Sequence, residues 1–276
     1  MKRGEGFFQG VGDVQLYYQY WWPEKDARAI LVIVHGFGEH SNRYTNVVNH
    51  LTSCSYGLYG FDIRGHGRSS GQRGHINDWG EYQGDLRAFL QMIIKQESDR
   101  PLFLLGHSMG GLIVLDYILR HPEGLRGAII SGALIKPTVD KPWRMTLARL
   151  VSRVLPRASF SVGLDKSVLS RDSEVIKAYD EDPLVHGVAT ARWGTELFAT
   201  IEWVKTHADE VRIPILMVHG EADRLNSSEG TCRFYEKVAF PDRELRIYPG
   251  GYHEPHNDLD HERVIRDFEK WLRRHL

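Results

Sequence analysis

Short apolar runs alternate with amphipathic segments along most of the chain. Nearly continuous apolar runs occupy residues 29–36, 57–63, 101–106, 127–132 and 214–220, and residues 245–251 form a sixth run. Strands that are covered on both faces need no alternation of polar and apolar side chains. The runs therefore predict buried strands of a parallel sheet.

Between these runs, apolar residues recur at helical spacing. The two clearest stripes consist of Leu86, Phe89, Leu90, Ile93 and Ile94, and of Val264, Ile265, Phe268, Trp271 and Leu272. A period of 3.6 residues predicts amphipathic helices. Acidic residues near 260 and basic residues near 273 mark the expected start and end of the second helix, as the helix macrodipole favours. Alternating strands and helices predict an α/β fold with a mostly parallel central sheet flanked by helices.

Two segments depart from this alternation. Residues 7–22 hold two aromatic-rich stretches around a Gly-Val-Gly-Asp turn, which predicts a β-hairpin. Residues 136–205 contain four prolines and amphipathic stretches, but no clear strand pattern. We interpret 136–205 as a helical cap inserted over the carboxyl edge of the sheet, where open α/β folds bind ligands. Residues 1–135 and 206–276 are then the core.

Composition narrows the class of protein. The 276 residues are 42% hydrophobic, which is enough for a large core. Lys and Arg total 35 and Asp and Glu total 36, so no net field attracts nucleic acid. No apolar run reaches 18 residues and the first residues lack the apolar stretch of a signal peptide, which predicts a cytoplasmic protein. Cys54 and Cys232 form no CxxC pair and are expected to be free thiols.

The motif Gly-His-Ser-Met-Gly-Gly spans residues 106–111 between a predicted strand and a predicted helix. In this context Gly-x-Ser-x-Gly is typical of a nucleophile elbow, a strained turn that presents a serine hydroxyl at the sheet edge. Gly106 and Gly110 are expected because side chains there would collide as strand and helix pack. Ser108 is therefore the candidate nucleophile.

A serine hydroxyl needs a base that a carboxylate orients, and in this fold the chain order is serine, acid, histidine. Asp223 follows one predicted strand and His253 follows the next, so both are expected beside Ser108. Glu221 is an alternative acid, and His256 and His261 are alternative bases.

Acyl transfer also needs backbone N–H groups for the developing oxyanion. Met109 follows the nucleophile at a helix N-terminus, and Phe37 lies in the loop after the first buried strand, so these two residues are the expected donors. The sequence His-Glu-Pro-His around Glu254 is one residue short of the zinc motif HExxH, and Pro255 disfavours the helix it requires. We expect no metal and no other cofactor.

Several motifs together resemble one enzyme group. The segments HGFGEHSNRY, GFDIRGHGRSSGQRG, GHSMGG and HGEADRL, with a late histidine, resemble the monoacylglycerol lipase and lysophospholipase group of α/β-hydrolases. The resemblance implies a cap over a hydrophobic acyl tunnel and a triad of Ser108, Asp223 and His253. It also implies that Glu39, Arg43 and His256 surround the glycerol moiety, although Glu39 and Arg43 form an ordinary loop ion pair in the alternative interpretation.

The resemblance predicts that the protein is a serine esterase. It would cleave the ester bond of monoacylglycerols, small lipid substrates, through an acyl-enzyme. Lysophospholipase, broad carboxylesterase and aminopeptidase activities are alternatives within the same fold, and the last would need cap carboxylates to hold a free amine. Asp180, Glu181 and Asp182 form the obvious cluster of that kind. A non-catalytic binding protein is the alternative outside enzymes, but such proteins typically lose a triad member.

Residues 141–157 predict a basic amphipathic helix in the cap. Its apolar face consists of Leu147, Leu150, Val151, Val154 and Leu155, and lysine and arginine cover the remainder. Such a helix can lie on an anionic membrane surface, or its apolar face can pack on the core while the cations are solvated. The first interpretation predicts a peripheral membrane contact through the cap.

Overall fold

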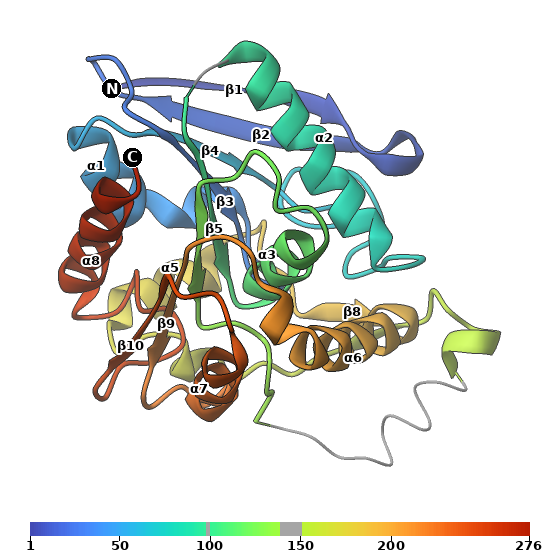
Figure 1. Ribbon diagram of the computed structural model, residues 1–276. Helices are drawn as coiled ribbons and strands as arrows, with labels where there is room; N and C mark the ends of the chain where they lie inside the picture. Colours follow the sequence, from blue (N-terminus) through green and yellow to red (C-terminus); the bar gives the residue numbers. More distant parts are fainter. Residues whose placement is uncertain (98–99, 139–150) are drawn as a thin grey trace.

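The computed structural model describes residues 1–97, 100–138 and 151–276 (Figure 1). Its main sheet has eight strands in the order β1-β2-β4-β3-β5-β6-β9-β10. The strands are β1 (Lys2–Gln9), β2 (Gln15–Trp22), β3 (Ile30–Val34), β4 (Gly57–Phe61), β5 (Leu102–His107), β6 (Gly127–Ser131), β9 (Ile215–Gly220) and β10 (Arg243–Tyr248). All six predicted strands and the hairpin are confirmed, and the hairpin begins earlier than predicted.

The sheet is antiparallel at one edge and parallel elsewhere. The hairpin strand β2 pairs with β4 in the antiparallel sense, whereas β4, β3, β5, β6, β9 and β10 all run parallel. Parallel strands end on the same side, so the loops after β3, β5, β9 and β10 meet at one edge. The sheet therefore gathers the predicted site residues although they lie far apart in the sequence.

Helices cover both faces of the sheet, which explains why its strands are apolar throughout. In β3, Val32 and Val34 belong to the core on one face and Leu31 and Ile33 to the core on the other, as side chains alternate along a strand. The first face is covered by α2 (Gly80–Gln96), α3 (Met109–Arg120), α6 (Ala191–Thr206) and α7 (Ser228–Lys237). The second face is covered by α1 (Thr45–Ser53) and α8 (His261–Arg274). The predicted stripe at 264–272 is confirmed, and so is the stripe at 86–93, but Ile94 was wrongly included, because it is 51% exposed at the end of α2.

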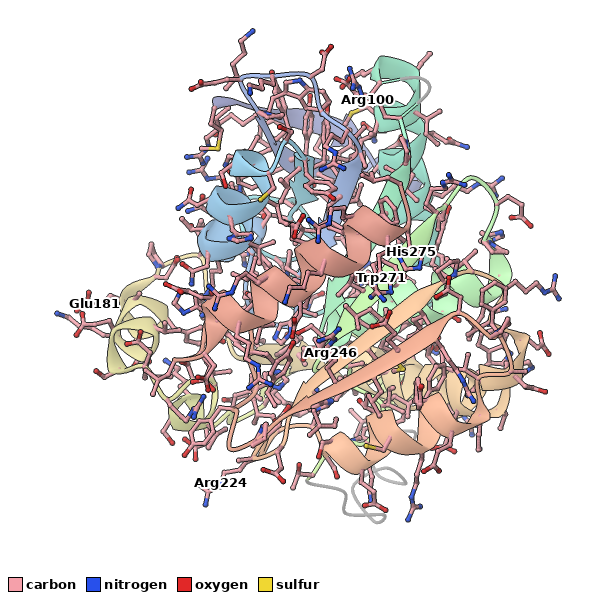
Figure 2. All side chains as sticks on the ribbon, turned by 60° about the vertical axis from the view of Figure 1, so that its left-hand side comes forward. Arg100, Glu181, Arg224, Arg246, Trp271 and His275 are labelled. Carbon is pink, nitrogen blue, oxygen red and sulfur yellow. The ribbon has the colours of Figure 1, made fainter. Side chains whose placement is uncertain are left out.

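Helix α8 shows how the second layer is anchored. Trp271 is fully buried and its ring lies edge-on to Phe103 of β5, with 5.9 Å between the ring centroids. Figure 2 shows α8 in front of the sheet and labels Trp271 near the C-terminal end of this helix. In the described part of the chain, no helix is long and apolar enough to cross a membrane.

The inserted segment contains strands that the sequence analysis did not predict. Strand β7 (Ser159–Ser161) pairs in the antiparallel sense with β8 (Val188–Thr190), so the expectation of no strand in 136–205 was wrong. The reason is length, because three exposed residues such as Ser-Phe-Ser carry too short a pattern to indicate a strand. The segment also contains the 3-10 turn η3 (Lys166–Val168) and α5 (Ser173–Glu181).

Most of the predicted basic helix at 141–157 lies outside the described residues. Its last part is described, and there residues 151–154 are helical. Val154 and Leu155, which the prediction placed on the apolar face, are 70% and 61% exposed. These two side chains are therefore not packed on the core.

Candidate active site

Ser108 occupies a strained turn between β5 and α3. Its backbone has φ 53° and ψ −116°, a conformation that residues other than glycine rarely adopt. A Cβ atom on Gly106 would lie 2.5 Å from the carbonyl oxygen of Gly110, and one on Gly110 would meet the carbonyl oxygen of Val34. The predicted elbow is confirmed, and close backbone packing is the reason for its two glycines.

The loops after β9 and β10 bring Asp223 and His253 to this serine. His253 Nε2 lies 3.0 Å from Ser108 Oγ, and His253 Nδ1 lies 2.7 Å from Asp223 Oδ2. All three side chains are buried. The three polar groups thus form one continuous hydrogen-bonded chain from hydroxyl to imidazole to carboxylate.

Asp223 is held by more donors than the sequence analysis identified. Its Oδ1 atom accepts hydrogen bonds from the backbone N–H groups of Leu225 (2.8 Å) and Asn226 (3.0 Å). Its Oδ2 atom accepts from His253 and also lies 3.0 Å from Nε2 of His219 at the end of β9. Burial alone would raise the pKa of Asp223, but the charge of His253 and the imidazole hydrogen bonds hold it well below its ordinary value. Asp223 is therefore ionised at neutral pH.

The pairing with Asp223 also shifts the pKa of His253. Burial lowers the pKa of His253, but the charge and hydrogen bond of Asp223 outweigh burial, so the net shift is upward from 6.5. Imidazole Nδ1–H donates to the carboxylate, which leaves Nε2 to accept the proton of Ser108.

The alternative acid and bases lie elsewhere. Glu221 is exposed and accepts a hydrogen bond from the backbone N–H of Gly250. His261 begins α8, and its Nδ1 contacts the carbonyl oxygen of Asp258. His256 is buried with its ring stacked on Tyr44 at 4.7 Å. The structure thus brings His253 and Asp223 to Ser108. It places the alternative acid and the two alternative bases elsewhere.

The loop after β3 lies against Ser108. A Cβ atom on Gly36 would lie 3.2 Å from Cβ of Ser108, so the backbone of this loop packs closely on the serine side chain. His35 holds the loop, because its Nδ1 contacts the carbonyl oxygen of Gly36 and its Nε2 accepts from the N–H of Ile63. In the described chain no acceptor takes the N–H of Phe37 or of Met109. The N–H groups of both residues thus have no acceptor among the described residues, and their role as oxyanion donors stays a prediction.

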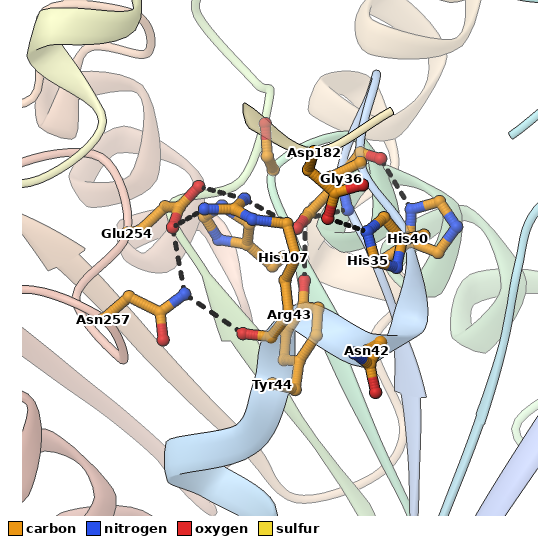
Figure 3. Close-up of polar contacts among 12 residues, drawn as sticks. His35, Gly36, His40, Asn42, Arg43, Tyr44, His107, Asp182, Glu254 and Asn257 are labelled. Carbon is orange, nitrogen blue, oxygen red and sulfur yellow. Dashed lines mark hydrogen bonds and ion pairs between the residues drawn. The ribbon is translucent and has the colours of Figure 1, made fainter. Parts of the chain in front are cut away.

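A buried ion network joins this loop to the loop of His253 (Figure 3). Arg43 donates to both oxygens of Glu254, at 2.7 and 2.9 Å, and to Glu39 Oε2 at 3.0 Å. Glu39 Oε1 in turn accepts from the N–H of Gly36 at 2.6 Å. Asn257 donates to Glu254 and to the carbonyl oxygen of Arg43. Sequence reasoning missed Glu254, which no motif distinguishes from an ordinary loop carboxylate.

The comparisons with known proteins agree with this geometry. A family model described as serine aminopeptidase S33 (Hydrolase_4) matches residues 25–260. The chain belongs to this α/β-hydrolase family. Its curated relatives include a monoacylglycerol lipase from Mycolicibacterium smegmatis, which is 34% identical and covers 99% of this chain and 98% of its own.

Solved hydrolase structures share the whole architecture. A monoacylglycerol lipase from Paleococcus ferrophilus superimposes with a TM-score of 0.84 at 32% identity, over 100% of both chains. A monoglyceride lipase from Saccharomyces cerevisiae, solved with a substrate analogue, gives a TM-score of 0.89 at 26% identity over 98% of this chain and 94% of its own. The chain is thus a hydrolase of the family that includes these lipases.

The His-Glu-Pro-His segment is close to a zinc motif in its sequence. Within the described ranges, no group of three or more His, Cys, Asp or Glu side chains could hold a metal ion. In the His-Glu-Pro-His segment, Glu254 is engaged by Arg43, and His253 points to Ser108. Both side chains are thus engaged by other protein side chains.

Proposed function

We propose that this hydrolase cleaves the ester bond of monoacylglycerols, with Ser108, His253 and Asp223 as its catalytic triad. The hydrogen-bonded chain from Ser108 Oγ to His253 at 3.0 Å and on to Asp223 at 2.7 Å carries the proposal. The substrate class is supported by relatives that are named monoacylglycerol lipase and align over nearly their full length.

The geometry supports a two-step acyl transfer. Ser108 Oγ attacks the ester carbonyl carbon while His253 Nε2 takes the hydroxyl proton, and Asp223 stabilises the resulting imidazolium. The N–H groups of Phe37 and Met109 would stabilise the oxyanion, each worth about 2.7–4 kcal/mol in such sites. The C–O bond to glycerol breaks as His253 returns its proton to the leaving oxygen. Water then attacks the acyl-enzyme, with His253 again as base, and releases the fatty acid.

We further propose that Glu39, Arg43 and His256 form the wall of the glycerol subsite. Glu39 and Arg43 are already paired with each other, so their contribution is a fixed polar surface. His256 differs, because its buried Nε2 has no hydrogen-bond partner among the described residues. Burial lowers the pKa of His256 to about 4, so this ring is neutral at neutral pH and can bond a substrate hydroxyl.

The cap is the proposed route of lipid entry. The sequence division placed 136–205 in the cap, but Trp193, Leu197 and Ile201 of α6 belong to the main core, which favours an earlier boundary before α6. We propose that residues 136–190 are the cap and that its outer side makes a peripheral contact with membranes. Exposed apolar side chains there, Val154, Leu155, Phe160 and Val162, support this contact. A cytoplasmic location stays a prediction.

A panel of substrates tests the activity. Wild-type protein should turn over monoacylglycerols faster than diacylglycerols, lysophosphatidylcholine or an aminoacyl amide. Preference for lysophosphatidylcholine would replace the proposal with a lysophospholipase, and equal turnover of all esters would indicate a broad carboxylesterase. Aminoacyl-amide cleavage is disfavoured, because Asp180 pairs with Lys166, Asp182 pairs with His40, and Glu181 projects outward from α5 (Figure 2).

The catalytic serine has its own test. Ser108→Ala removes the nucleophile and should lower kcat on a p-nitrophenyl ester by about a millionfold, as loss of a serine nucleophile does elsewhere. The same variant should resist labelling by a fluorophosphonate that labels the wild type. Ser167→Ala is the matched control, since that hydroxyl contacts Asp165 on the exposed side of η3. Retained esterase activity in Ser108→Ala would reject the proposed triad.

A further inference from the structure

The triad carboxylate has a second imidazole on the same oxygen atom. His219 Nε2 lies 3.0 Å from Asp223 Oδ2 and 3.0 Å from the carbonyl oxygen of Asn226. Both neighbours are acceptors only, so Nε2 must carry a proton and donate. His219 therefore shares Oδ2 with His253, whose Nδ1 is 2.7 Å away.

A threonine hydroxyl contacts the other nitrogen of the His219 ring. His219 Nδ1 lies 2.7 Å from Oγ1 of Thr231 in α7, and with the proton on Nε2 it accepts the hydroxyl proton of Thr231. Both residues are buried, at 0% and 1% exposure. A flipped ring would leave buried polar groups without partners, which is costly, so the orientation of His219 is determined by its surroundings.

We propose that His219 is a positioning residue of the triad, and that its Nε2–H limits how tightly Asp223 holds the protonated form of His253. The inference rests on the proposed catalytic role of Ser108, His253 and Asp223. A carboxylate oxygen that already accepts one hydrogen bond has less charge to offer a second donor. With His219 in place, the imidazolium formed during catalysis can return its proton readily. Without it, His253 becomes a stronger base and is protonated at a higher pH.

Other ionisable groups face His253 and stay unchanged in the test. They are Glu39 from the loop after β3, His107 from β5, and Glu254 and His256 from the loop of His253 itself. Glu39 and Glu254 are both paired with Arg43. A change confined to His219 therefore reports on Asp223 and not on these neighbours.

The test is the pH dependence of kcat/KM in His219→Leu with a p-nitrophenyl ester. The acid limb of this profile reports the base of the free enzyme. We expect the limb to move to higher pH by about half a unit to one unit, because Asp223 loses one donor and binds the His253 proton more tightly. Below the limb, kcat/KM should fall about threefold to tenfold, and the loss should vanish at alkaline pH. A purely structural role predicts a loss of equal size at every pH.

Two variants serve as controls. His219→Gln keeps an N–H donor for Asp223 and an oxygen for Thr231, so its acid limb should match the wild type. Thr231→Val changes a side chain in the same buried cluster but leaves both acceptors of the His219 Nε2–H group. The acid limb of its kcat/KM profile should therefore also stay in place. An unmoved limb in His219→Leu, or equal shifts in all three variants, would overturn the proposal.

A measurement on the wild type avoids any dependence on folding of the variants. The ¹⁵N chemical shifts of histidine-labelled protein should place the neutral-state proton of His219 on Nε2. A proton on Nδ1 would overturn the proposal. An inactive wild type would instead contradict the proposed function, so the two failures are distinguishable.

Discussion

Two neighbouring parts of the cap differ in how deeply their side chains are buried. We call residues 166–171 the inner cap and residues 151–165 the outer cap. In the inner cap, Val168, Leu169 and Ser170 are at most 5% exposed. In the outer cap, Val154, Leu155 and Phe160 are more than half exposed. The outer cap has anchors of its own, such as Ser152, which is 2% exposed and contacts Thr195 of α6 at 3.1 Å. The two parts therefore differ in the apolar side chains that they leave exposed.

The inner cap is hydrogen-bonded directly to the loop that carries His253. The N–H of Glu254 donates to the carbonyl oxygen of Leu169 at 2.8 Å, and that of His253 lies 3.4 Å from the carbonyl oxygen of Val168. Asp258 accepts from the backbone N–H of Arg171 at 2.8 Å and from its side chain at 2.9 Å. A cap movement that opens the site must therefore leave these six residues in place or displace His253.

The largest effect is expected at Glu254, where the inner cap, the histidine loop and Arg43 meet. Glu254→Gln leaves buried Arg43 with one carboxylate in place of two, so the free energy of unfolding should fall by about 3 kcal/mol. Urea unfolding measures the loss, and kcat should fall with it because the histidine loop loosens. Glu181→Gln, at the exposed end of α5, is the control and should change stability by less than about 0.5 kcal/mol. Equal stability of both variants would contradict the idea that the ion pair of Glu254 with Arg43 supports the loop of His253.

The second-largest loss of stability is expected at Asp258. Asp258→Asn removes the charge that Arg171 and three backbone N–H groups surround, and it should cost about 2–3 kcal/mol. Asp260→Asn is a matched control, because Asp260 pairs with the same arginine but is 55% exposed. A similar loss in both variants would remove the distinction between buried and exposed anchors.

The stabilising effect of Asp258 should also depend on pH. Burial would raise the pKa of Asp258, but hydrogen bonds from Tyr252, Arg171 and Leu259 outweigh it and hold the pKa below 3.8. A depressed pKa stabilises the folded state above the ordinary value, and this contribution is lost as pH falls through the folded value. The stability gap between wild type and Asp258→Asn should therefore be constant near neutral pH and shrink below 3.8. A gap that persists unchanged at pH values well below this would contradict the assignment.

The smallest effect on the folded enzyme is expected in the outer cap. Val154→Asp with Leu155→Asp should change the melting temperature and the turnover of a soluble ester very little, because both side chains are already exposed. Co-sedimentation with anionic vesicles should decrease, since the apolar contact is lost. Phe7→Asp, on the hairpin and 58% exposed, is the control and should leave vesicle binding unchanged. Unaltered vesicle binding in the double variant would reject the proposed membrane contact.

Much of the fold and the triad could be predicted because the relevant signals are local. Apolar runs mark strands that are covered on both faces, and glycines around Ser108 mark a backbone too crowded for side chains. Parallel strands end at one edge, so residues that follow their ends meet whatever their separation in the sequence. That rule and the chain order of serine, acid and histidine favoured Asp223 and His253 but left alternatives. The contacts with Ser108 in the folded chain then separated these two residues from the alternatives.

Only the tertiary structure decided which partners these residues have. His219 and Glu254 lie in motifs that were noted in the sequence, but nothing local indicates their partners, because those fold beside them from distant segments. The pairing of β7 with β8 and the packing of α6 on the core also depend on such long-range contacts. The sequence by itself thus determined the order of elements and the reacting groups. The assembled fold determined how each group is oriented and charged, because burial and hydrogen bonding arise only when remote side chains meet.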